Sequence, residues 1–499
     1  MPTRITHYLS RHRQQAQISA LGCLVALCSP GRTLAQSASF RWSDPAAWGG
    51  QVPAAGARVT IPANRTIVLD VPTAPLAGLT ILGTLVAGDA DVAITAGYVL
   101  VDGGRLEIGT AAVPFQRTAT ITLSGTSVGA PTPALMHFGN KVLAVHGGTL
   151  SLHGRPVTTA WTKLAADVAA GSAQLTLTEP TGWRAGDRIV IATSSMKMQE
   201  FDTAEIRSIA GTSVTLAQPL TYRHLGAVRR VGDVSVDVRA EVGLLSHNIV
   251  VQGDASSEAS RIGGHAMFMN SASKASVQIA RVSFRRMGQL NQLGRYPVHF
   301  HLMGNATGSY VRESAIDGSI QRGIVLHAVS GVQVVGNVVF NTVGHNVVVE
   351  TENTTNNVLD RNLALVNRQP SPLPTQPELA SQNDRLPSNY WFKSGQNMVT
   401  NNAAAGSFDS GFNYDGIGAE AITFRRNVAH ASMGQEGVGP GDFDLAAGVL
   451  IVSEAPRPAT DVIADAVVYH NAIGFWPEES GRFIVDRMVA ADNDLHTEN

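Results

Sequence analysis

Three histidines and one carboxylate recur in short apolar segments between residues 298 and 350. They are His299, His301, His327 and Glu350. An imidazole can take up or release a proton near neutral pH, and a carboxyl group can protonate a leaving oxygen. A lone histidine on a strand is usually only solvated, but several titratable groups on adjacent segments favour a catalytic or substrate-binding site.

Strand alternation predicts that these side chains share one face. In the segment 298–302 an inward Phe300 leaves His299 and His301 pointing outward. In the same register His327 points outward on the next segment, and Glu350 on the segment after it. The other candidates on this predicted polar strip are His345 for catalysis and Asn346, Tyr390, Trp391, Lys393, Asn413 and Asp415 for substrate binding.

The elements that carry the strip are predicted to be coils of a solenoid. Gly323-Ile-Val-Leu-His327 and Gly344-His-Asn-Val-Val348 begin 21 residues apart, and the runs are too short for helices. At this repeat length each coil buries its apolar face only when neighbouring coils stack on it. The sequence therefore predicts an all-β chain that forms a parallel β-helix, with coils roughly 4.8 Å apart.

A second repeated position is polar but predicted to be structural. Its members, at intervals of 23, 25, 40 and 25 residues, are Ser314, Asn337, Asn362, Asn402 and Asn427. Stacked asparagines can hydrogen-bond from one strand to the next. The long interval contains the proline-rich stretch 369–387, and loops of this length are more often functional than simple spacers.

The start of the chain and its charge limit the class of protein. The apolar run 18–28 follows three arginines and precedes small residues ending at Ala35, which predicts a signal peptide at 1–35. The run is too short to span a bilayer, so we expect the protein to be secreted, periplasmic or on the cell surface. We also expect it to be a monomer. Without residues 1–35 there are 33 Lys and Arg against 39 Asp and Glu. This balance argues against nucleic acid as a partner, and an anionic substrate would need a local basic patch.

Turn signals divide the remaining chain into three parts. Residues 36–160 contain short strands separated by Gly and Pro, and are predicted to form a β domain that caps the solenoid. Residues 161–222 are predicted to form a small inserted β subdomain that contains no candidate catalytic or binding residues. Residues 223–499 are predicted to form the β-helix.

The polar strip allows several kinds of chemistry. A long groove suits a polymer such as an extracellular polysaccharide, on whose sugar rings Tyr390 and Trp391 could stack. For hydrolysis Glu350 is the best acid and Asp415 its outward partner, because two carboxyl groups must flank the scissile bond. The His-x-His pair could instead bind a metal, and strip oxygens could hold calcium. A polysaccharide lyase or a non-catalytic glycan-binding protein also fits the strip.

The sequence resembles the cell-migration-inducing hyaluronidase family. The likeness is carried by YPVHFHLMG at 296–304, SYVR at 309–312, VGH at 343–345 and NNAAAGS at 401–407, and WSDPAAWGGQVPAAG at 42–56 resembles that family's eight-glycine domain. The resemblance implies an eight-glycine domain followed by a right-handed β-helix, with hyaluronan depolymerisation outside cells. It carries over His299, His301, His327, His345 and Glu350. Thr351 departs from the acidic residue expected there. The leading prediction is an exported, endo-acting hydrolase of hyaluronan-like uronic-acid polymers.

Overall fold

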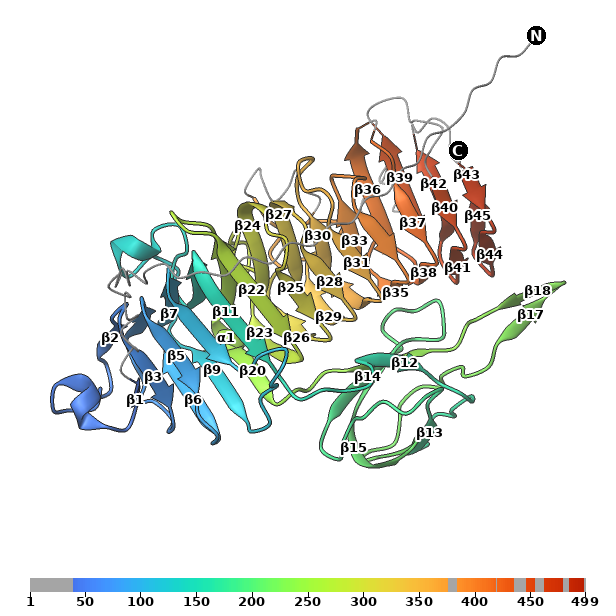
Figure 1. The fold of residues 1–499 in the computed structure, drawn as a ribbon. Coiled ribbons are helices and arrows are strands. Elements are labelled where there is room, and N and C mark those ends of the chain that lie inside the picture. The colour runs from blue at the N-terminus through green and yellow to red at the C-terminus, as the bar shows by residue number, and fades with distance from the viewer. Residues whose placement is uncertain are drawn as a thin grey trace, which may run out of the picture. The chain divides into compact units, whose positions relative to one another are not determined.

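The computed structural model describes residues 39–375, 384–418, 420–434, 446–453, 462–478 and 484–497. The described chain folds as a right-handed parallel β-helix with three long sheets (Figure 1), as predicted. The predicted signal peptide lies outside the described residues. Among the helices described, none has the length and apolar character needed to cross a membrane.

From β7 onward each coil supplies one strand to each of three sheets, here named A, B and C. Sheet A consists of β1 (Ser39–Arg41), β3 (Thr66–Leu69), β5 (Thr84–Ala87), β8 (Arg105–Ile108), β11 (Gly148–His153), β22 (Ala275–Ala280), β25 (Tyr310–Arg312), β28 (Gln333–Val335), β31 (Val358–Asp360), β34 (Met398–Thr400), β37 (Thr423–Arg425), β40 (Val462–Ala464) and β43 (Ile484–Asp486). Sheet B consists of β2 (Arg58–Ile61), β4 (Gly78–Ile81), β7 (Tyr98–Asp102), β10 (Val142–His146), β21 (His265–Met269), β24 (Val298–Asn305), β27 (Ile324–Ser330), β30 (Val347–Val349), β33 (Tyr390–Phe392), β36 (Phe412–Ile417), β39 (Ala447–Ser453), β42 (Ile473–Glu478) and β45 (Leu495–Thr497). Sheet C consists of β6 (Val92–Ala96), β9 (Ala119–Leu123), β20 (Ile249–Gly253), β23 (Val282–Met287), β26 (Ala315–Ser319), β29 (Val338–Val343), β32 (Leu363–Arg368), β35 (Ala403–Ser407), β38 (Val428–Ser432), β41 (Val467–Tyr469) and β44 (Val489–Ala491).

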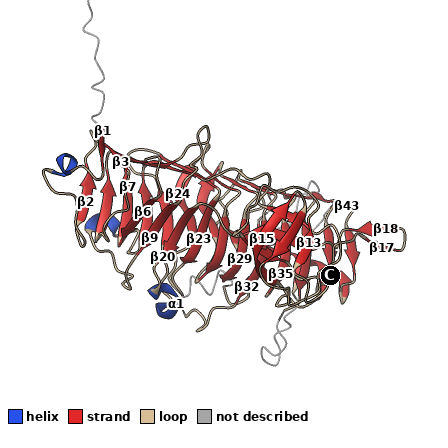
Figure 2. Cartoon of the chain, turned by 90° about the horizontal axis from the view of Figure 1, so that it is seen from below, coloured by secondary structure: helices blue, strands red, loops and turns tan. Residues whose placement is uncertain are grey.

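The interior of the coils is filled by side chains that stack from one strand of sheet B to the next. The rings of Phe268 and Phe300 lie 5.2 Å apart between centroids, and those of Tyr390 and Phe412 lie 4.5 Å apart. These residues alternate with outward-facing neighbours, as strands with one buried face require. Figure 2 shows the strands as successive rungs, with the short helix α1 (Ser256–Ser260) outside the stack. Two 3-10 turns, η1 (Pro45–Trp48) and η2 (Pro133–Leu135), are also described.

The repeated asparagines form a hydrogen-bonded ladder at the turn from sheet A to sheet C, which confirms their structural role. Nδ2 of Asn362 donates to the carbonyl oxygen of Val334 at 2.8 Å and to Oδ1 of Asn402 at 2.9 Å. Its Oδ1 accepts from the backbone N and from Nδ2 of Asn337, at 3.0 and 2.9 Å. Arg361, one residue earlier, has a φ of 51°, so the turn is closed by a left-handed residue. The asparagine then pairs backbone groups that this turn leaves without a strand partner.

Replacing Asn362 with alanine is expected to lower the free energy of unfolding by about 2–3 kcal/mol, because it leaves several buried donors and acceptors of the ladder unpaired. Urea denaturation measures this loss. Asn353→Ala, at an exposed position, is the matched control and should change the midpoint little. Equal midpoints for the two variants would contradict a structural role for the ladder.

Residues 39–153, most of the β domain predicted at 36–160, form the first coils of the same solenoid and share its sheets. β11 pairs in parallel with β8 on one side and with β22 on the other. Strands before and after the insertion therefore belong to the same sheets. The sequence did not show this, because the early strands are separated by irregular glycine and proline turns.

The antiparallel subdomain is longer than predicted and ends at residue 244 instead of 222. Its sheet consists of β12 (Trp161–Lys163), β13 (Gln174–Thr176), β14 (Arg188–Ile191), β15 (Asp202–Ala210), β16 (Ser213–Leu216) and β19 (Glu241–Leu244), and a separate hairpin of β17 (Arg229–Val231) and β18 (Val234–Val236) precedes β19. The segment 241–244 is apolar enough to pass for a solenoid strand. Gly243 lies against sheet C, where an added Cβ would come within 2.8 Å of Val338. The subdomain therefore packs closely on the solenoid.

Glu241 makes the contact between the subdomain and the solenoid sensitive to acid. Its Oε2 lies 3.0 Å from Nε2 of His430 on β38, and its Oε1 lies 3.3 Å from Nζ of Lys163. Burial alone raises the pKa of Glu241, but the charges of Lys163 and His430 lower it to about 2. A carboxyl group with a depressed folded-state pKa stabilises the protein above its unfolded value, and that stability is lost as the pH falls through the folded value.

We therefore expect the free energy of unfolding to fall as the pH drops from about 4.5 to about 2, and Glu241→Gln to flatten the slope in this window. Urea denaturation at a series of pH values measures the slope. Glu205→Gln, at an exposed position of β15, is the control. A slope in Glu241→Gln equal to that of the wild type would contradict this assignment.

Candidate functional site

The three predicted histidines converge on the outer side of sheet B. β24 carries His299 and His301, and the pairing of β24 with β27 sets His301 directly beside His327. The ring centroid of His301 lies 4.7 Å from each of the other two, which are 6.0 Å apart. His299 is buried, whereas His301 and His327 are half-buried. These three side chains are called the histidine cluster below.

Glu350, the residue after β30, contacts the cluster from the next coil. Its Oε2 lies 3.0 Å from Nδ1 of His327 and 3.9 Å from Nε2 of His299. Its Oε1 accepts a hydrogen bond from Nη1 of Arg322 at 2.9 Å. Burial alone raises the pKa of Glu350, but the hydrogen bond from His327 and the charge of Arg322 lower it to about 2. Glu350 is therefore ionised at neutral pH and is a poor proton donor, which corrects its predicted role as the acid.

Arg322 and Asp384 extend this contact into a buried charge network that the sequence analysis did not identify. Nε of Arg322 donates to Oδ1 of Asp384 at 2.7 Å, and both side chains are almost fully buried. Asp384 belongs to the proline-rich stretch 369–387, which was expected to be functional. Nδ1 of His345 accepts the backbone N–H of Ser388, so His345 turns Nε2 toward Asp384, 3.6 Å away. His345 thus supports the network from below the surface.

Hydrogen bonds decide where the cluster holds its protons. Nδ1 of His299 lies 3.1 Å from the carbonyl oxygen of Gly294, which can only accept, so Nδ1 is protonated and Nε2 presents a lone pair. Nδ1 of His327 donates to Glu350. Burial lowers the pKa of His299 to about 3 and that of His301 to about 4, so both rings are neutral at pH 7.

The predicted polar strip continues beyond the cluster in one row, because the strand registers place His327, Glu350, Lys393 and Asp415 side by side on successive coils. The neighbouring row, which begins at His299, is apolar: Val325, Val348 and Trp391 form a buried group with Tyr296. The ring of Trp391 also stacks on His345 at a centroid distance of 5.2 Å. Trp391 is therefore inaccessible to a sugar ring, and its predicted stacking role is wrong.

Two further substrate-binding predictions fail because the residues are buried and already engaged. The hydroxyl of Tyr390 lies inside the coil and donates to the carbonyl oxygen of Asn362 at 2.9 Å. Nδ2 of Asn346 donates to the carbonyl oxygen of Val339 at 2.8 Å, which fixes a turn of the coil. Alternation along one strand does not reveal such turn residues, because they point neither in nor out.

The far end of the predicted strip remains partly accessible. Lys393 and Asp415 are half-buried, and Nζ of Lys393 lies 3.8 Å from Oδ1 of Asp415. Oδ2 of Asp415 accepts the indole N–H of Trp391 at 3.0 Å. Asn413 is buried beside Trp391 and cannot be reached by a polymer. Lys393 and Asp415 thus stay candidates for substrate contact.

The oxygens proposed for calcium are each engaged by a different protein group. Oδ1 of Asn346 accepts from the hydroxyl of Thr342 at 3.0 Å, Glu350 accepts from Arg322, and Asp415 accepts from Trp391. Within the described ranges, the histidine cluster is the one group of three metal-ligating side chains whose donor atoms come together, all within 4.8 Å of one another. The chemistry of this face therefore rests on imidazole nitrogens.

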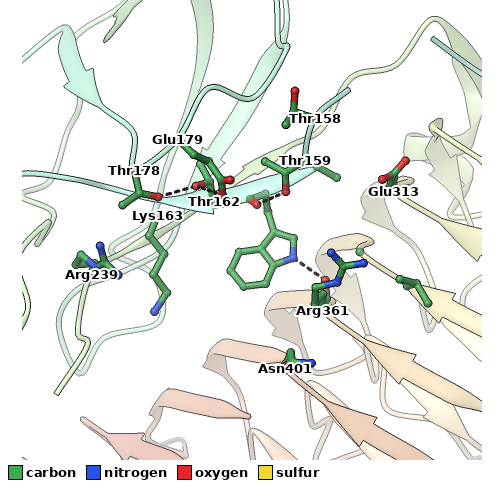
Figure 3. Close-up of a pocket in the computed structure, with 14 residues that line it drawn as sticks. Thr158, Thr159, Thr162, Lys163, Thr178, Glu179, Arg239, Glu313, Arg361 and Asn401 are labelled. Atoms are coloured by element: carbon green, nitrogen blue, oxygen red, sulfur yellow. Dashed lines mark hydrogen bonds between the residues drawn. The ribbon is translucent and has the colours of Figure 1, made fainter. Parts of the chain in front are cut away.

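Further clefts lie elsewhere on the molecule, and two of them are described here. One, of about 410 Å³, opens between the antiparallel subdomain and sheet A (Figure 3). There the indole N–H of Trp161 donates to the carbonyl oxygen of Arg361 at 2.6 Å. The other, of about 480 Å³, lies along sheet C and is lined by five arginines and two acids, namely Arg188, Arg261, Arg285, Arg286, Arg368, Glu258 and Asp317. This second cleft is a local basic patch on an acidic chain.

Comparison with known proteins identifies two domains. Residues 47–165 match the G8 domain, and residues 261–422 match the family described as CEMIP beta-helix. Human fibrocystin-L is 33% identical over 417 residues, which cover 75% of this chain and 10% of that protein. A G8 domain-containing protein of Dictyostelium discoideum is 29% identical over 402 residues, which cover 76% of this chain and 34% of that protein.

The chain thus spans only a tenth to a third of the length of these two relatives. Among solved structures, a tailspike of Acinetobacter baumannii bacteriophage AP22 in complex with a capsular saccharide aligns over 81% of this chain and 68% of that chain. The TM-score of that alignment is 0.20 and the identity 10%, values too low to support an inference.

Proposed function

Because the chain belongs to the family that joins a G8 domain to a CEMIP β-helix, we propose that it cleaves an extracellular polysaccharide at the face formed by the histidine cluster and Glu350. The observation that carries this proposal is the convergence of His299, His301 and His327 beside a buried carboxylate. The expected signal peptide supports action outside the cytoplasm.

The charge network beneath the cluster is better explained by function than by stability. Burying Arg322, Glu350 and Asp384 costs desolvation energy, and buried ion pairs seldom stabilise a fold more than apolar side chains of the same volume. The network does, however, hold His327 in one tautomer and one orientation. Residues that orient a reactive imidazole are typical of catalytic sites.

The geometry favours elimination over hydrolysis. Hydrolysis by two carboxyl groups requires a protonated acid beside an ionised carboxylate. Glu350, which Arg322 holds ionised, suits only the second role, and its predicted partner Asp415 lies two coils away beside Lys393. Elimination from a uronic-acid polymer requires an electron-pair donor, which this face offers. The proton leaves C5 of the uronate for that donor, the C4–O bond breaks, a C4=C5 double bond forms, and the departing oxygen takes up a proton from water.

An anionic polymer is the substrate class that the charges support. The chain carries a basic patch in the arginine-lined cleft, which lies on sheet C and not on the face of the histidine cluster. Lys393 offers a further cation on the same sheet as the cluster. Hyaluronan, chondroitin, pectate and alginate all carry the uronate that elimination needs.

Incubating the protein with each of these four polymers tests the proposal. Gel filtration follows chain length, and ultraviolet absorbance follows the unsaturated uronate. We expect at least one polymer to shorten with a parallel rise in absorbance. Shortening without absorbance would overturn the reaction class in favour of hydrolysis. If no polymer shortens, the proposed cleavage is wrong and the face is at most a glycan-binding surface.

A further inference from the structure

We propose that His299, His301 and His327 together bind one divalent transition-metal ion, with zinc as the best fit. The site would have three imidazole ligands and a fourth position open toward solvent. This inference deepens the proposed function by assigning a cofactor to the same face, but metal binding can be measured without any glycan.

The geometry of the three rings suits a single ion. Their donor atoms all lie within 4.8 Å of one another. Zinc–nitrogen bonds of about 2.1 Å at tetrahedral angles place ligand nitrogens about 3.4 Å apart. Small side-chain rotations therefore suffice to close the site. The backbone pairing between His301 and His327 already holds two of the three ligands on adjacent strands.

Two of the three histidines also have a buried ring nitrogen without a hydrogen-bond partner among the described residues. Nε2 of His299 is buried, makes no hydrogen bond within the described chain and lies 3.9 Å from Glu350. Nδ1 of His301 is likewise buried with no hydrogen-bond partner among the described residues. Buried polar atoms without partners are rare in folded proteins, and a missing ion is one of the ordinary explanations.

Hydrogen bonds from behind hold two of the three ligands in place. Metal-binding histidines usually donate their second N–H to a carboxylate or a backbone carbonyl, which fixes the tautomer and the ring orientation. His327 donates to Glu350, and His299 donates to the carbonyl oxygen of Gly294. Glu350 in turn is held by Arg322. The cluster thus has the supporting contacts of a metal site on two of its three ligands.

The donor set selects the class of ion. Three neutral imidazoles suit zinc and its neighbours among the transition metals, whereas calcium and magnesium require mostly oxygen ligands. Three protein ligands with an open fourth position are typical of catalytic zinc sites, where a bound water becomes acidic near neutral pH. With an ion bound, such a water would supply the electron pair that cleavage needs, because the imidazole lone pairs would be used as ligands.

Metal titration of the whole chain tests the inference. The protein is stripped with a chelator, freed of the chelator and titrated with Zn²⁺, while Co²⁺ serves as a spectroscopic probe through its visible absorption. We expect one ion per chain. His301→Ala and His327→Ala should each weaken binding on the order of 100-fold or more, since losing even a supporting residue typically costs 10- to 100-fold. His146→Ala is the matched control, because His146 pairs with Asp102 on the surface of the same sheet.

A thermal melt of each variant shows whether that variant is folded, so that a loss of metal binding is not confused with a loss of folding. Zn²⁺ should raise the melting temperature of the wild type and of His146→Ala, and leave His301→Ala and His327→Ala unchanged. Failure of the stripped wild type to bind Zn²⁺ or Co²⁺, or equal binding by all variants, would overturn the inference. Glycan cleavage that continues at full rate in the stripped protein would also overturn it while leaving the proposed function intact. Stoichiometric metal binding without cleavage of any polymer would uphold the metal site and contradict the proposed function.

Discussion

Replacing Arg322 with methionine is expected to lower the free energy of unfolding by about 3–5 kcal/mol, because Glu350 and Asp384 are then left buried without their cation. Urea denaturation measures the loss. Arg117→Met is the matched control, since the Arg117 side chain pairs with Asp89 at the surface and such pairs contribute little.

Neutralising the two carboxylates as well should restore much of this stability. In the triple variant Arg322→Met, Glu350→Gln, Asp384→Asn no unpaired charge remains, and buried ion networks can often be replaced by neutral groups at little cost. A loss below about 1 kcal/mol in Arg322→Met alone would contradict the existence of the buried network. Failure of the triple variant to recover stability would show that the loss arises from packing and not from charge.

Replacing His301 with alanine is expected to reduce kcat/KM for polymer cleavage by about 10²- to 10⁴-fold, the range for a positioned group that handles a proton or holds its acceptor. His301 is half-buried and makes no hydrogen bond through Nδ1 among the described residues, so its loss should change stability little. Initial rates of chain shortening measure the effect.

His146→Ala on β10 controls for the loss of a half-exposed imidazole from the same sheet. The two variants should have similar denaturation midpoints and very different rates. Equal rates for His301→Ala and the wild type would remove the cluster from the reaction, whatever polymer is cleaved.

Alternation and repeat length were sufficient to predict the solenoid and the outward direction of His299, His301 and His327. Both follow from local rules, since a strand has a period of two and each coil repeats its neighbour. The asparagine ladder was predictable for the same reason. The boundary of the antiparallel subdomain was not, because the apolar segment 241–244 is compatible with either kind of sheet.

The protonation state of the site depends on contacts that no local pattern shows. Glu350 was predicted to be an acid, and it is ionised because Arg322 and His327 reach it from neighbouring coils. Asp384 comes from a loop whose length suggested function but whose path was not predictable. Trp391 points outward as expected, yet Tyr296 and two valines cover it. To predict that an outward-facing residue is buried requires knowledge of the whole surface around it.

A crystal structure of the His301→Ala variant with a uronic-acid oligosaccharide tests the central claim most directly, because a slow variant should retain its substrate. The account predicts a sugar on the outer side of sheet B, with a glycosidic bond beside His327 and the space left by His301. Binding of the sugar in the cleft beside Trp161 (Figure 3), with sheet B empty, would contradict it.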